Sequence, residues 1–382
     1  TARTTKILAE VIEKNERSVG ASMPALAAMI TRRYQHDSGL SPERLQSILC
    51  RVAIKNHYNG SLNPYAQFRK LLSEADYQNS KWVSTPLHTY DCAPITDGAV
   101  AVLLTAEKKR VRIAGVGHAT DTLAVRHRDS LTSFRSTRLA AYQAYNMAKV
   151  NLAEVHDAFT MFEIIGTEDL GFFPPKQGWM AVEEGVTSIQ GKLPINPSGG
   201  LKARGHPVGA SGLAQIAEVV WQLRGEVEAR RQVPGARIGL TQNIGGLANN
   251  NLVVILERTD RYRAIPTYWK PAFDPGTIES KENFDTPPTV NTGTVETFTT
   301  LFTTPEGIPS PLTLAFVRTD VGQMILTRAR EQNLSIGQQV QLEKDGDLIY
   351  SRPLPPSGGL QEGFKRWLRG TLTLPKRKED NP

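Results

Sequence analysis

The stretch from residue 196 to residue 226 joins a glycine-rich segment to an amphipathic one, and it constrains the fold more than any other part of the chain. Five glycines come first: Gly199, Gly200, Gly205, Gly209 and Gly212. Apolar residues then recur at steps of three and four: Leu213, Ile216, Ala217, Val220 and Leu223. This spacing predicts a helix that packs one face on a core, preceded by a loop whose backbone can approach a ligand closely.

His206 lies inside this loop and is followed by Pro207. The first amides of a helix lack intrahelical partners, so the loop offers hydrogen-bond donors beside an imidazole. The positive end of a helix also disfavours a protonated imidazole. His206 is therefore a candidate neutral general base, and the alternative is a structural histidine in a loop that only caps a helix.

Length and composition narrow the class of protein. With 382 residues the chain is too long for one typical core, which favours two domains. Hydrophobic residues make up 40% of the sequence, and no apolar run approaches the roughly 20 residues that span a bilayer. The N-terminus lacks the apolar core of a signal peptide, so we expect a cytoplasmic protein without a membrane span.

Charge and cysteine content exclude further classes. Two cysteines are too few for a disulfide framework or a four-cysteine zinc site, and we expect no bound metal. The net charge of +7 comes from basic residues that are spread along the chain, with one dense cluster in the tail PKRKEDNP. A phosphate-bearing small substrate or plain solubility explains this charge better than nucleic acid does.

The first half of the chain holds one clear helix and one clear strand. Residues 41–57 predict a helix with Ser41 as its N-cap and a buried stripe of Leu45, Ile48, Leu49 and Val52. Residues 55–68 are polar and turn-rich, and predict a lid, a subunit contact or a solvated connection. The apolar run Ala99 to Leu104 predicts a strand buried on both faces. We interpret Cys50 and Cys92 as structural, since neither has the surroundings of an activated thiol.

Two further motifs place polar groups next to predicted strands. Val155 could end a strand that delivers His156 and Asp157 at its carboxyl end, where open α/β sheets bind ligands. A core histidine is the alternative for His156. The turn Asn243 to Gly246 lies between apolar strands at residues 238–241 and 252–256, and either only reverses the chain or also aims amides into a site. Strand, loop, helix and strand together indicate an α/β layered domain.

The composition changes near residue 259. Residues 259–292 are proline-rich and predict a linker. Residues 293–368 contain short strand candidates divided by Gly, Pro and Asp turns, a pattern typical of a small all-β barrel. Phe298, Phe302 and Phe316 follow core alternation rather than forming an exposed stacking surface, which disfavours single-stranded nucleic acid as a ligand. Residues 369–382 are a charged tail.

Several of these motifs together resemble the thiolase superfamily. GGLKARGHPVGASG (199–212) is similar to the histidine-bearing signature of thiolases, and HDAF (156–159) to the form found in lipid-transfer-type, sterol-carrier-like thiolases and acetyl-CoA acetyltransferases. KNHYNGSLNPYAQF, DCAPITDGA and the turn at 243–246 match the same branch in order, so the resemblance covers residues 15–258. Residues 293–350 resemble the OB-fold domains that partner such thiolases, here without their zinc ribbon.

The resemblance implies a fold and a set of site residues. The expected fold class is α/β: a thiolase-like layered domain over residues 1–258, mostly the second half of the family fold, followed by a small all-β OB-like barrel. His206 would activate a nucleophilic cysteine, His156 would donate to the thioester oxygen, and the amide of Gly245 would lie near the acyl group. Substrate-binding candidates are Asn243, Gly246, Gly205 and Ser211. The family's nucleophilic cysteine matches neither Cys50 nor Cys92, so it would be supplied from outside these residues.

Three functions follow as hypotheses. The first is a thiolase-like acyl-CoA C-acyltransferase that makes or cleaves the C–C bond of a 3-oxoacyl-CoA, with coenzyme A or acyl-CoA as substrate. The second is a cysteine-free retro-aldol acyl-CoA lyase, and the third a non-catalytic acyl-CoA or lipid carrier. By resemblance we also expect a homo-oligomer, or a companion subunit that covers the missing half of the fold.

Overall fold

The computed structural model describes residues 7–145, 150–260 and 291–354. The tail predicted at 369–382 and nearly all of the linker predicted at 259–292 lie outside the described residues. No helix among the described residues is long and apolar enough to cross a membrane. The helices are α2 (Lys14–Ser18), α3 (Met23–Asp37), α4 (Pro42–Ser61), α5 (Glu74–Gln78), η1 (Thr89–Asp91), η2 (Val125–His127), α6 (Arg135–Ala144), α7 (Thr160–Asp169), α8 (Gly178–Glu183), α9 (Gly200–Ala203) and α10 (Ser211–Arg224).

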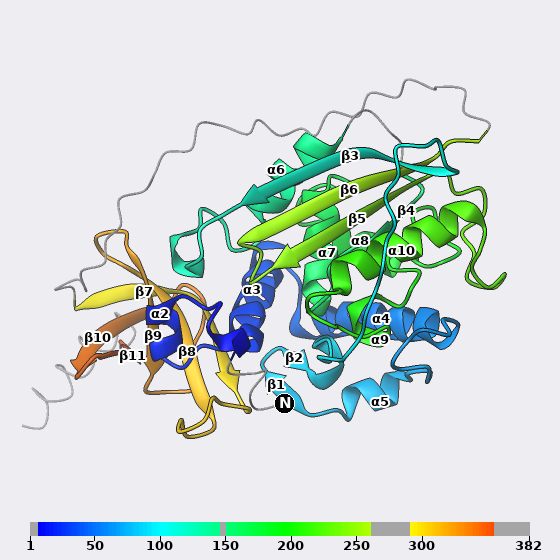
Figure 1. The fold of residues 1–382 in the computed structure, drawn as a ribbon. Helices are drawn as coiled ribbons and strands as arrows, with labels where there is room; N and C mark the ends of the chain where they lie inside the picture. Colours follow the sequence, from blue (N-terminus) through cyan, green and yellow to red (C-terminus); the bar gives the residue numbers. More distant parts are fainter. Residues whose placement is uncertain (1–6, 146–149, 261–290, 355–382) are drawn as a thin grey trace, which may run out of the picture.

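A four-stranded sheet forms the centre of the larger part of the molecule (Figure 1). Its order is β3-β6-β5-β4, with bounds Val111–Thr120, Asn250–Arg258, Ile238–Gly245 and Leu152–Glu154. β4 and β5 run parallel, and the other two pairs are antiparallel. Because β4 ends at Glu154, the chain delivers His156 just beyond the carboxyl end of this strand, as the sequence predicted.

Helices cover both faces of this sheet. Val253 and Ile255 of β6 lie in one apolar cluster with alanines of α6, whereas Val254 and Leu256 lie in another with Val219 and Leu223 of α10. Alternate residues of one strand thus point to opposite faces, as the pleat requires. Gly115 and Gly117 of β3 allow α6 to approach closely, since a Cβ at Gly117 would lie 1.8 Å from the Ala140 carbonyl oxygen. The larger part is therefore the predicted α/β layered domain.

α4 is longer than the sequence indicated. Ser41 caps it, and its predicted stripe from Leu45 to Val52 is buried. The helix then continues to Ser61, through residues predicted as a turn-rich loop, and this part of the prediction is wrong. Gly60 lies within the last turn because a Cβ there would come 2.5 Å from the Cβ of Ala203. Close packing against α9, rather than a chain reversal, thus explains the glycine.

A closed five-stranded barrel forms the smaller part. Its strands are β7 (Thr292–Leu301), β8 (Leu312–Thr319), β9 (Met324–Ala329), β10 (Gln339–Asp345) and β11 (Leu348–Pro353). Their order is β10-β11-β9-β8-β7, and pairing of β10 with β7 closes the barrel. Phe316 is fully buried, whereas Phe302 is 45% exposed. The predicted core alternation is therefore wrong at Phe302, which lies just beyond the end of β7.

The barrel is built into the larger part rather than tethered to it. The two-residue strand β2 (Leu87–His88) pairs with β1 (Trp82–Ser84), and β1 pairs with β7. Barrel residues such as Phe316 belong to the same apolar cluster as Leu26 of α3 and Ile48 of α4. Figure 1 shows α2 and α3 lying against the barrel strands. The two parts therefore share one core.

Residues 99–104 do not form the strand that the sequence predicted. They have no regular secondary structure, and Leu103 and Leu104 are 93% and 71% exposed. The apolar pattern of a buried strand is present, but no described segment pairs with it or covers it. The prediction of a strand buried on both faces is wrong for this chain as it stands.

Candidate active site

His156 lies in a short segment between β4 and α7. Its amide donates to Oε1 of Gln242 on β5, at 3.0 Å, and its side chain is buried. The next residue, Asp157, accepts a hydrogen bond from the Leu201 amide at 2.7 Å and one from Nδ2 of Asn56 at 2.8 Å. Asp157 thereby ties the end of β4 to α9 and α4, and fixes the direction in which His156 points.

Glycine is required where the chain passes this carboxylate. Gly200 has φ +61°, and a Cβ there would lie 2.5 Å from Asp157 Oδ2. Gly199 has φ +100°, and a Cβ there would lie 2.7 Å from the Cα of Gly60. The glycines at 199 and 200 thus serve close packing of α9 against α4 and Asp157, and the loop then carries the chain to His206.

His206 is held on both sides by backbone hydrogen bonds. Its amide donates to the Pro94 carbonyl at 3.1 Å, and its carbonyl accepts from the Thr96 amide at 3.2 Å. Gly205 has φ +109°, and a Cβ there would lie 2.8 Å from Oγ1 of Thr96. The segment 94–96 therefore fixes the backbone of this histidine.

The two predicted histidines meet. The ring centroids of His156 and His206 are 5.2 Å apart, and the ring planes stand at 88° to each other. Burial and, as the smaller cause, the nearby charge of Arg204 together lower the pKa of His206 to about 4. Burial also lowers the pKa of His156 well below its usual value, with His206 and Arg204 as smaller causes. Both imidazoles are neutral near pH 7.

The tautomer of His206 follows from Ser211, at the first position of α10. The Ser211 hydroxyl donates to the Pro207 carbonyl at 3.3 Å, so its oxygen accepts from Nδ1 of His206 at 2.7 Å. With the proton on Nδ1, the Nε2 atom carries the lone pair. His206 is thereby set to take up a proton at Nε2.

The tautomer of His156 is the opposite one. The backbone carbonyl of Gln242 can only accept a hydrogen bond. The side-chain amide of Gln215 is therefore oriented so that its Nε2 donates to this carbonyl, at 3.1 Å. Oε1 of Gln215 then accepts from Nδ2 of Asn243 at 3.3 Å, and the same Nδ2 donates to Nδ1 of His156 at 3.2 Å. Because Nδ1 accepts, the proton lies on Nε2. His156 is set to donate a hydrogen bond, and Asn243 acts on it rather than standing apart.

α10 packs differently from the prediction. Leu213 is 42% exposed, whereas Gln215, Glu218 and Gln222 are buried together with Val219. The buried face is shifted because these polar residues find partners there: Gln215 bonds β5, and Glu218 pairs with the buried Arg231. The helix is confirmed. The predicted stripe is wrong at Leu213, whereas Leu223 is buried and Ile216 and Val220 are partly buried against the same apolar cluster.

The remaining predicted residues lie at the same end of the sheet. Gly245 ends β5 opposite Asn250, and Gly246 follows with φ +61° in the turn to β6. The contribution of these two glycines to substrate binding stays a prediction, as does that of Gly205. Three residues that sequence reasoning missed also matter here: Gln215, Gln242 and Arg204. No sequence pattern marks these three residues as part of the site, because the role of a polar residue in a helix or strand depends on which residues it contacts in the fold.

Neither cysteine is hydrogen-bonded to His156 or His206 as an activated thiol would be. Burial raises the pKa of Cys50 to about 11 and that of Cys92 to about 12. Neither sulfur hydrogen-bonds to an imidazole among the described residues. The described residues also contain no cluster of three or more side chains that could hold a metal ion. The site as described has a base and a donor but no activated thiol.

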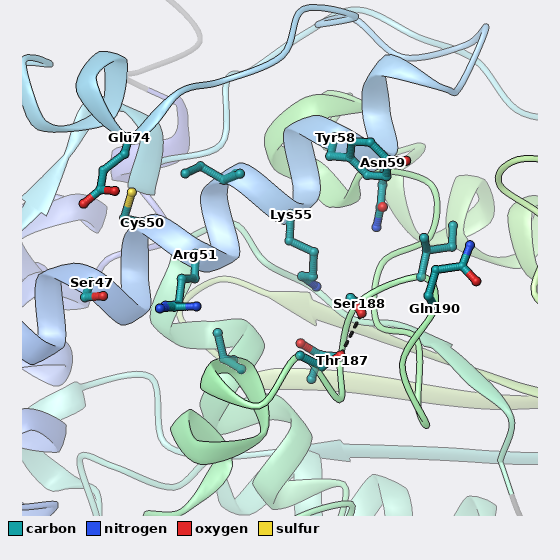
Figure 2. A pocket seen from close by; sticks show the side chains of 14 residues that line it. Ser47, Cys50, Arg51, Lys55, Tyr58, Asn59, Glu74, Thr187, Ser188 and Gln190 are labelled. Carbon is teal, nitrogen blue, oxygen red and sulfur yellow. Dashed lines mark hydrogen bonds between the residues drawn. The ribbon is translucent and has the colours of Figure 1, made fainter.

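A separate hollow of about 650 Å³ lies along α4. Figure 2 shows Arg51 and Lys55 of α4 on one side and Thr187, Ser188 and Gln190 on the other. Lys55 is not free there, since its Nζ pairs with Glu163 at 2.6 Å. Neither His156 nor His206 lines this hollow, so the candidate active site is the histidine pair and not the hollow.

Comparisons with known proteins show what the chain is similar to. Residues 117–258 match the family model "Thiolase C-terminal domain-like". Over 255 residues the chain is 44% identical to an acetyl-CoA acetyltransferase of Methanothermobacter thermautotrophicus, which covers 64% of this chain and 65% of that relative. It is 36% identical over 212 residues to sterol carrier protein 2 of Oryctolagus cuniculus, covering 51% of this chain and 39% of the relative.

A solved structure has a similar fold over most of the chain. A monomeric SCP2-thiolase like protein type 1 from Mycobacterium smegmatis covers 89% of this chain and 75% of its own, with a TM-score of 0.62 and 14% sequence identity. The chain spans about 65% of the length of the acetyl-CoA acetyltransferase that it matches. Residues 117–258 thus match a thiolase C-terminal domain-like region, and the chain is a homologue of acetyl-CoA acetyltransferases and of sterol carrier protein 2.

Proposed function

We propose that this chain carries the base and the oxyanion donor of a thiolase-type acyl-CoA C-acyltransferase, which makes or cleaves the C–C bond of a 3-oxoacyl-CoA. One observation carries the proposal: the ring centroids of two imidazoles lie 5.2 Å apart, and their hydrogen-bond partners assign the protons to opposite ring atoms. Claisen-type chemistry needs these two groups, one to move a proton and one to stabilise developing negative charge. The nucleophilic thiol comes from outside these 382 residues.

In the cleavage direction each group has a defined task. Nε2 of His206 takes the proton of the thiol, and the thiolate sulfur attacks the 3-oxo carbon of the substrate. The C–C bond then breaks, and its electron pair passes to the departing acetyl-CoA as an enolate. Nε2–H of His156 donates to the thioester oxygen on which this charge develops. A proton returns to the enolate carbon, and free coenzyme A takes the acyl group from sulfur.

Coenzyme A and its thioesters are the substrates in this proposal, and no metal takes part. We keep the sequence-based expectation of a cytoplasmic protein that works as an oligomer or with a companion subunit. Gly245, Gly246 and Gly205 would provide backbone contacts to the acyl group or the pantetheine.

Steady-state kinetics test the proposal. With acetoacetyl-CoA and coenzyme A, the native enzyme should give the parallel double-reciprocal lines of a ping-pong reaction, because an acyl-enzyme forms. His206→Ala should lower kcat by about 10²- to 10⁴-fold, the range for loss of a general base. His118→Ala is the matched control, since His118 is exposed on β3 and bonds Asn250 instead. Intersecting lines with an unaffected His206→Ala variant would contradict the proposal.

A retro-aldol acyl-CoA lyase is the second candidate. The observation that favours it is that neither cysteine sulfur reaches an imidazole. In that reaction His206 would take the proton of a β-hydroxyl group, and His156 would stabilise the enolate of the departing acyl-CoA. Release of a free aldehyde or ketone from a 3-hydroxyacyl-CoA, without any need for coenzyme A, would identify it. Tight acyl-CoA binding without turnover of either substrate class would instead support a carrier.

A further inference from the structure

The hollow along α4, which we call the α4 hollow, is lined by one helix in an ordered way. Two rows of α4 side chains, each at steps of four residues, border it: a polar row of Ser47, Arg51, Lys55 and Asn59, and a mainly apolar row of Cys50, Ile54 and Tyr58. Residues four apart share one face of a helix, so the polar row extends over about 18 Å of helix length. The α4 hollow therefore suits a ligand with a polar group and an apolar body.

The opposite wall is the segment that follows α8, and backbone hydrogen bonds hold it in place. The Leu193 amide donates to the Val186 carbonyl at 3.0 Å, and the Ile195 amide donates to the Thr187 carbonyl at 3.0 Å. Gly191 packs against the same segment, since a Cβ there would lie 2.2 Å from the Val186 carbonyl oxygen. This wall is therefore preformed, as is usual for small-molecule sites.

Thr187 places an unpartnered hydroxyl at the α4 hollow. The residue is only 2% exposed and lines the hollow, and its Oγ1 forms no hydrogen bond within the described part of the chain. Buried hydroxyls are hydrogen-bonded in the large majority of native structures. The missing partner of Thr187 is therefore expected to be a group that enters the α4 hollow.

Arg51 supplies the available charge. Its guanidinium forms no hydrogen bond or ion pair among the described residues, whereas Nζ of Lys55 donates to Glu163 at 2.6 Å and to the Ile195 carbonyl at 2.8 Å. Glu74 also lines the α4 hollow, but Figure 2 shows it beside Cys50, at the end away from Gln190. One guanidinium can neutralise one negative charge, and its planar shape matches a carboxylate.

From these observations we propose that the α4 hollow binds an organic monocarboxylate with an apolar body. The carboxylate lies between the Arg51 guanidinium and the Thr187 hydroxyl, and the apolar body lies against Ile54 and Ile189. The volume of about 650 Å³ is within the range of small-molecule sites. Because neither catalytic histidine lines the hollow, this inference goes beyond the proposed function and does not rest on it.

Octanoate is the probe that tests this site. Titration calorimetry of the full chain should give a Kd below about 1 mM, a weak affinity that suits so small a ligand. In protein with ¹³C-labelled isoleucine methyl groups, the signals of Ile54 and Ile189 should shift during the titration, and that of Ile325 in the barrel core should not. Shifts that leave out Ile54 and Ile189, or no binding at millimolar octanoate, would overturn the proposal.

The head group is tested with two analogues of the same chain length. Octanol has no charge and should bind at least about tenfold more weakly than octanoate, because the charged hydrogen bond to Arg51 is lost. Octyl phosphate carries more charge than one guanidinium neutralises and should also bind more weakly. Equal binding of octanol would mean that Arg51 recognises no charge, and tighter binding of octyl phosphate would replace the carboxylate by a phosphate ester. Either result would overturn the proposal.

A matched pair of variants locates the charge that binds octanoate. Arg51→Gln should weaken octanoate binding at least about tenfold and leave octanol binding unchanged. Arg17→Gln is the control, since Arg17 is exposed on α2 and does not line the α4 hollow. Both variants should unfold at the wild-type temperature, because both side chains are exposed. Equal octanoate affinity of the two variants would contradict the inference.

Thr187→Val tests the hydroxyl separately. This change removes one hydrogen-bonding group and keeps the branched shape of the side chain, so octanoate should bind about three- to tenfold more weakly. The same variant should bind octanol no more weakly than the wild-type protein does relative to octanoate. Unchanged octanoate binding by Thr187→Val would show that the carboxylate does not lie beside this hydroxyl, and would overturn the proposed pose.

Discussion

At the scale of single residues, the account depends on the charge and the tautomer of two histidines. His156 is buried and His206 is partly buried, and an imidazole removed from water is favoured in its neutral form. Ser211 and Asn243 then assign the protons, because one accepts from its histidine and the other donates. The same residue type therefore takes two roles within 5.2 Å, and neighbours rather than the histidines themselves decide which.

The first prediction concerns the titration of His206. Its folded-state pKa of about 4 lies below the ordinary 6.5, so the neutral ring contributes stability that is fully present above pH 6.5 and lost as the pH falls toward 4. NMR of ¹⁵N-labelled histidines should show His206 neutral at pH 6 and charged only near pH 4. A ring that titrates at 6.5 would contradict the buried environment.

Arg204 gives a second test of the same site. Its charge is the second cause of the low pKa of His206, after burial, and its guanidinium nitrogens are buried without a hydrogen-bond partner among the described residues. Arg204→Met should therefore raise the pKa of His206, and the same NMR titration reads it. Arg51→Met, on the distant hollow of α4, should leave that pKa unchanged.

The third prediction reverses the tautomer of His156. In Asn243→Asp a carboxylate replaces the amide donor, so Nδ1 of His156 should become protonated and Nε2 should lose its proton. ¹⁵N chemical shifts of the ring report this exchange directly, and kcat should fall because the oxyanion donor is lost. Asn333→Asp, at an exposed position of the barrel, controls for the added charge. Unchanged ring shifts in Asn243→Asp would refute the assignment.

At the scale of elements, glycines fix how α4, α9 and the end of β4 meet. Gly200 combines a left-handed φ of +61° with a gap too small for a Cβ beside Asp157. Gly235 has a similar φ of +64° but open space around it. Substitution at Gly235 therefore tests backbone strain alone, whereas substitution at Gly200 tests strain together with a steric clash.

The fourth prediction uses this pair. Gly235→Ala should lower the free energy of unfolding by about 1 kcal/mol, the cost of a left-handed alanine, and Gly200→Ala by at least about 3 kcal/mol, since the Asp157 contact is also broken. Urea denaturation measures both values. Equal losses in the two variants would show that Asp157 does not constrain the loop.

The sequence predicted elements better than their surroundings. The spacing of Leu45, Ile48 and Val52 found α4, and the motif around His206 found the loop and α10. Periodicity could not find where α4 ends, because Gly60 reads as a turn until Ala203 is seen beside it. Nor could it find the polar part of the buried face of α10, since partners on other elements bury Gln215 and Glu218.

The site was predicted in part for the same reason. Motif resemblance named both histidines, and the structure brings them together. The network from Gln242 through Gln215 to Asn243 was not predictable, because it joins a strand and a helix through amide groups without sequence periodicity. Residues 99–104 were predicted as a buried strand from their own apolar character, whereas they are largely exposed and pair with no strand among the described residues.

At the scale of the whole molecule, the barrel and the layered domain act as one body. Thr297 of β7 donates to the Met29 carbonyl of α3, Arg32 of α3 donates to the Phe298 carbonyl, and β1 extends the barrel sheet. The apolar cluster that contains Phe316 also contains residues of α3, α4 and α7. Separation of the two parts would expose this shared core.

The fifth prediction follows from that shared core. Calorimetry of the full chain should show one unfolding transition whose calorimetric and van't Hoff enthalpies agree, as for a single cooperative unit. Phe316→Ala should lower the temperature of this one transition without splitting it, since the lost contacts belong to both parts. Two resolved transitions would mean that the barrel is an independent domain.

The central claim, acyl transfer through a thiol held against His206, is tested most directly by intact mass. The protein is purified from its native source, incubated with acetyl-CoA, denatured, and the mass of every chain present is recorded. The account predicts one acetyl group on a cysteine that lies outside these 382 residues, and no acetyl group in a His206→Ala preparation. Unmodified masses for every chain, in a preparation that turns over acyl-CoA, would contradict the account.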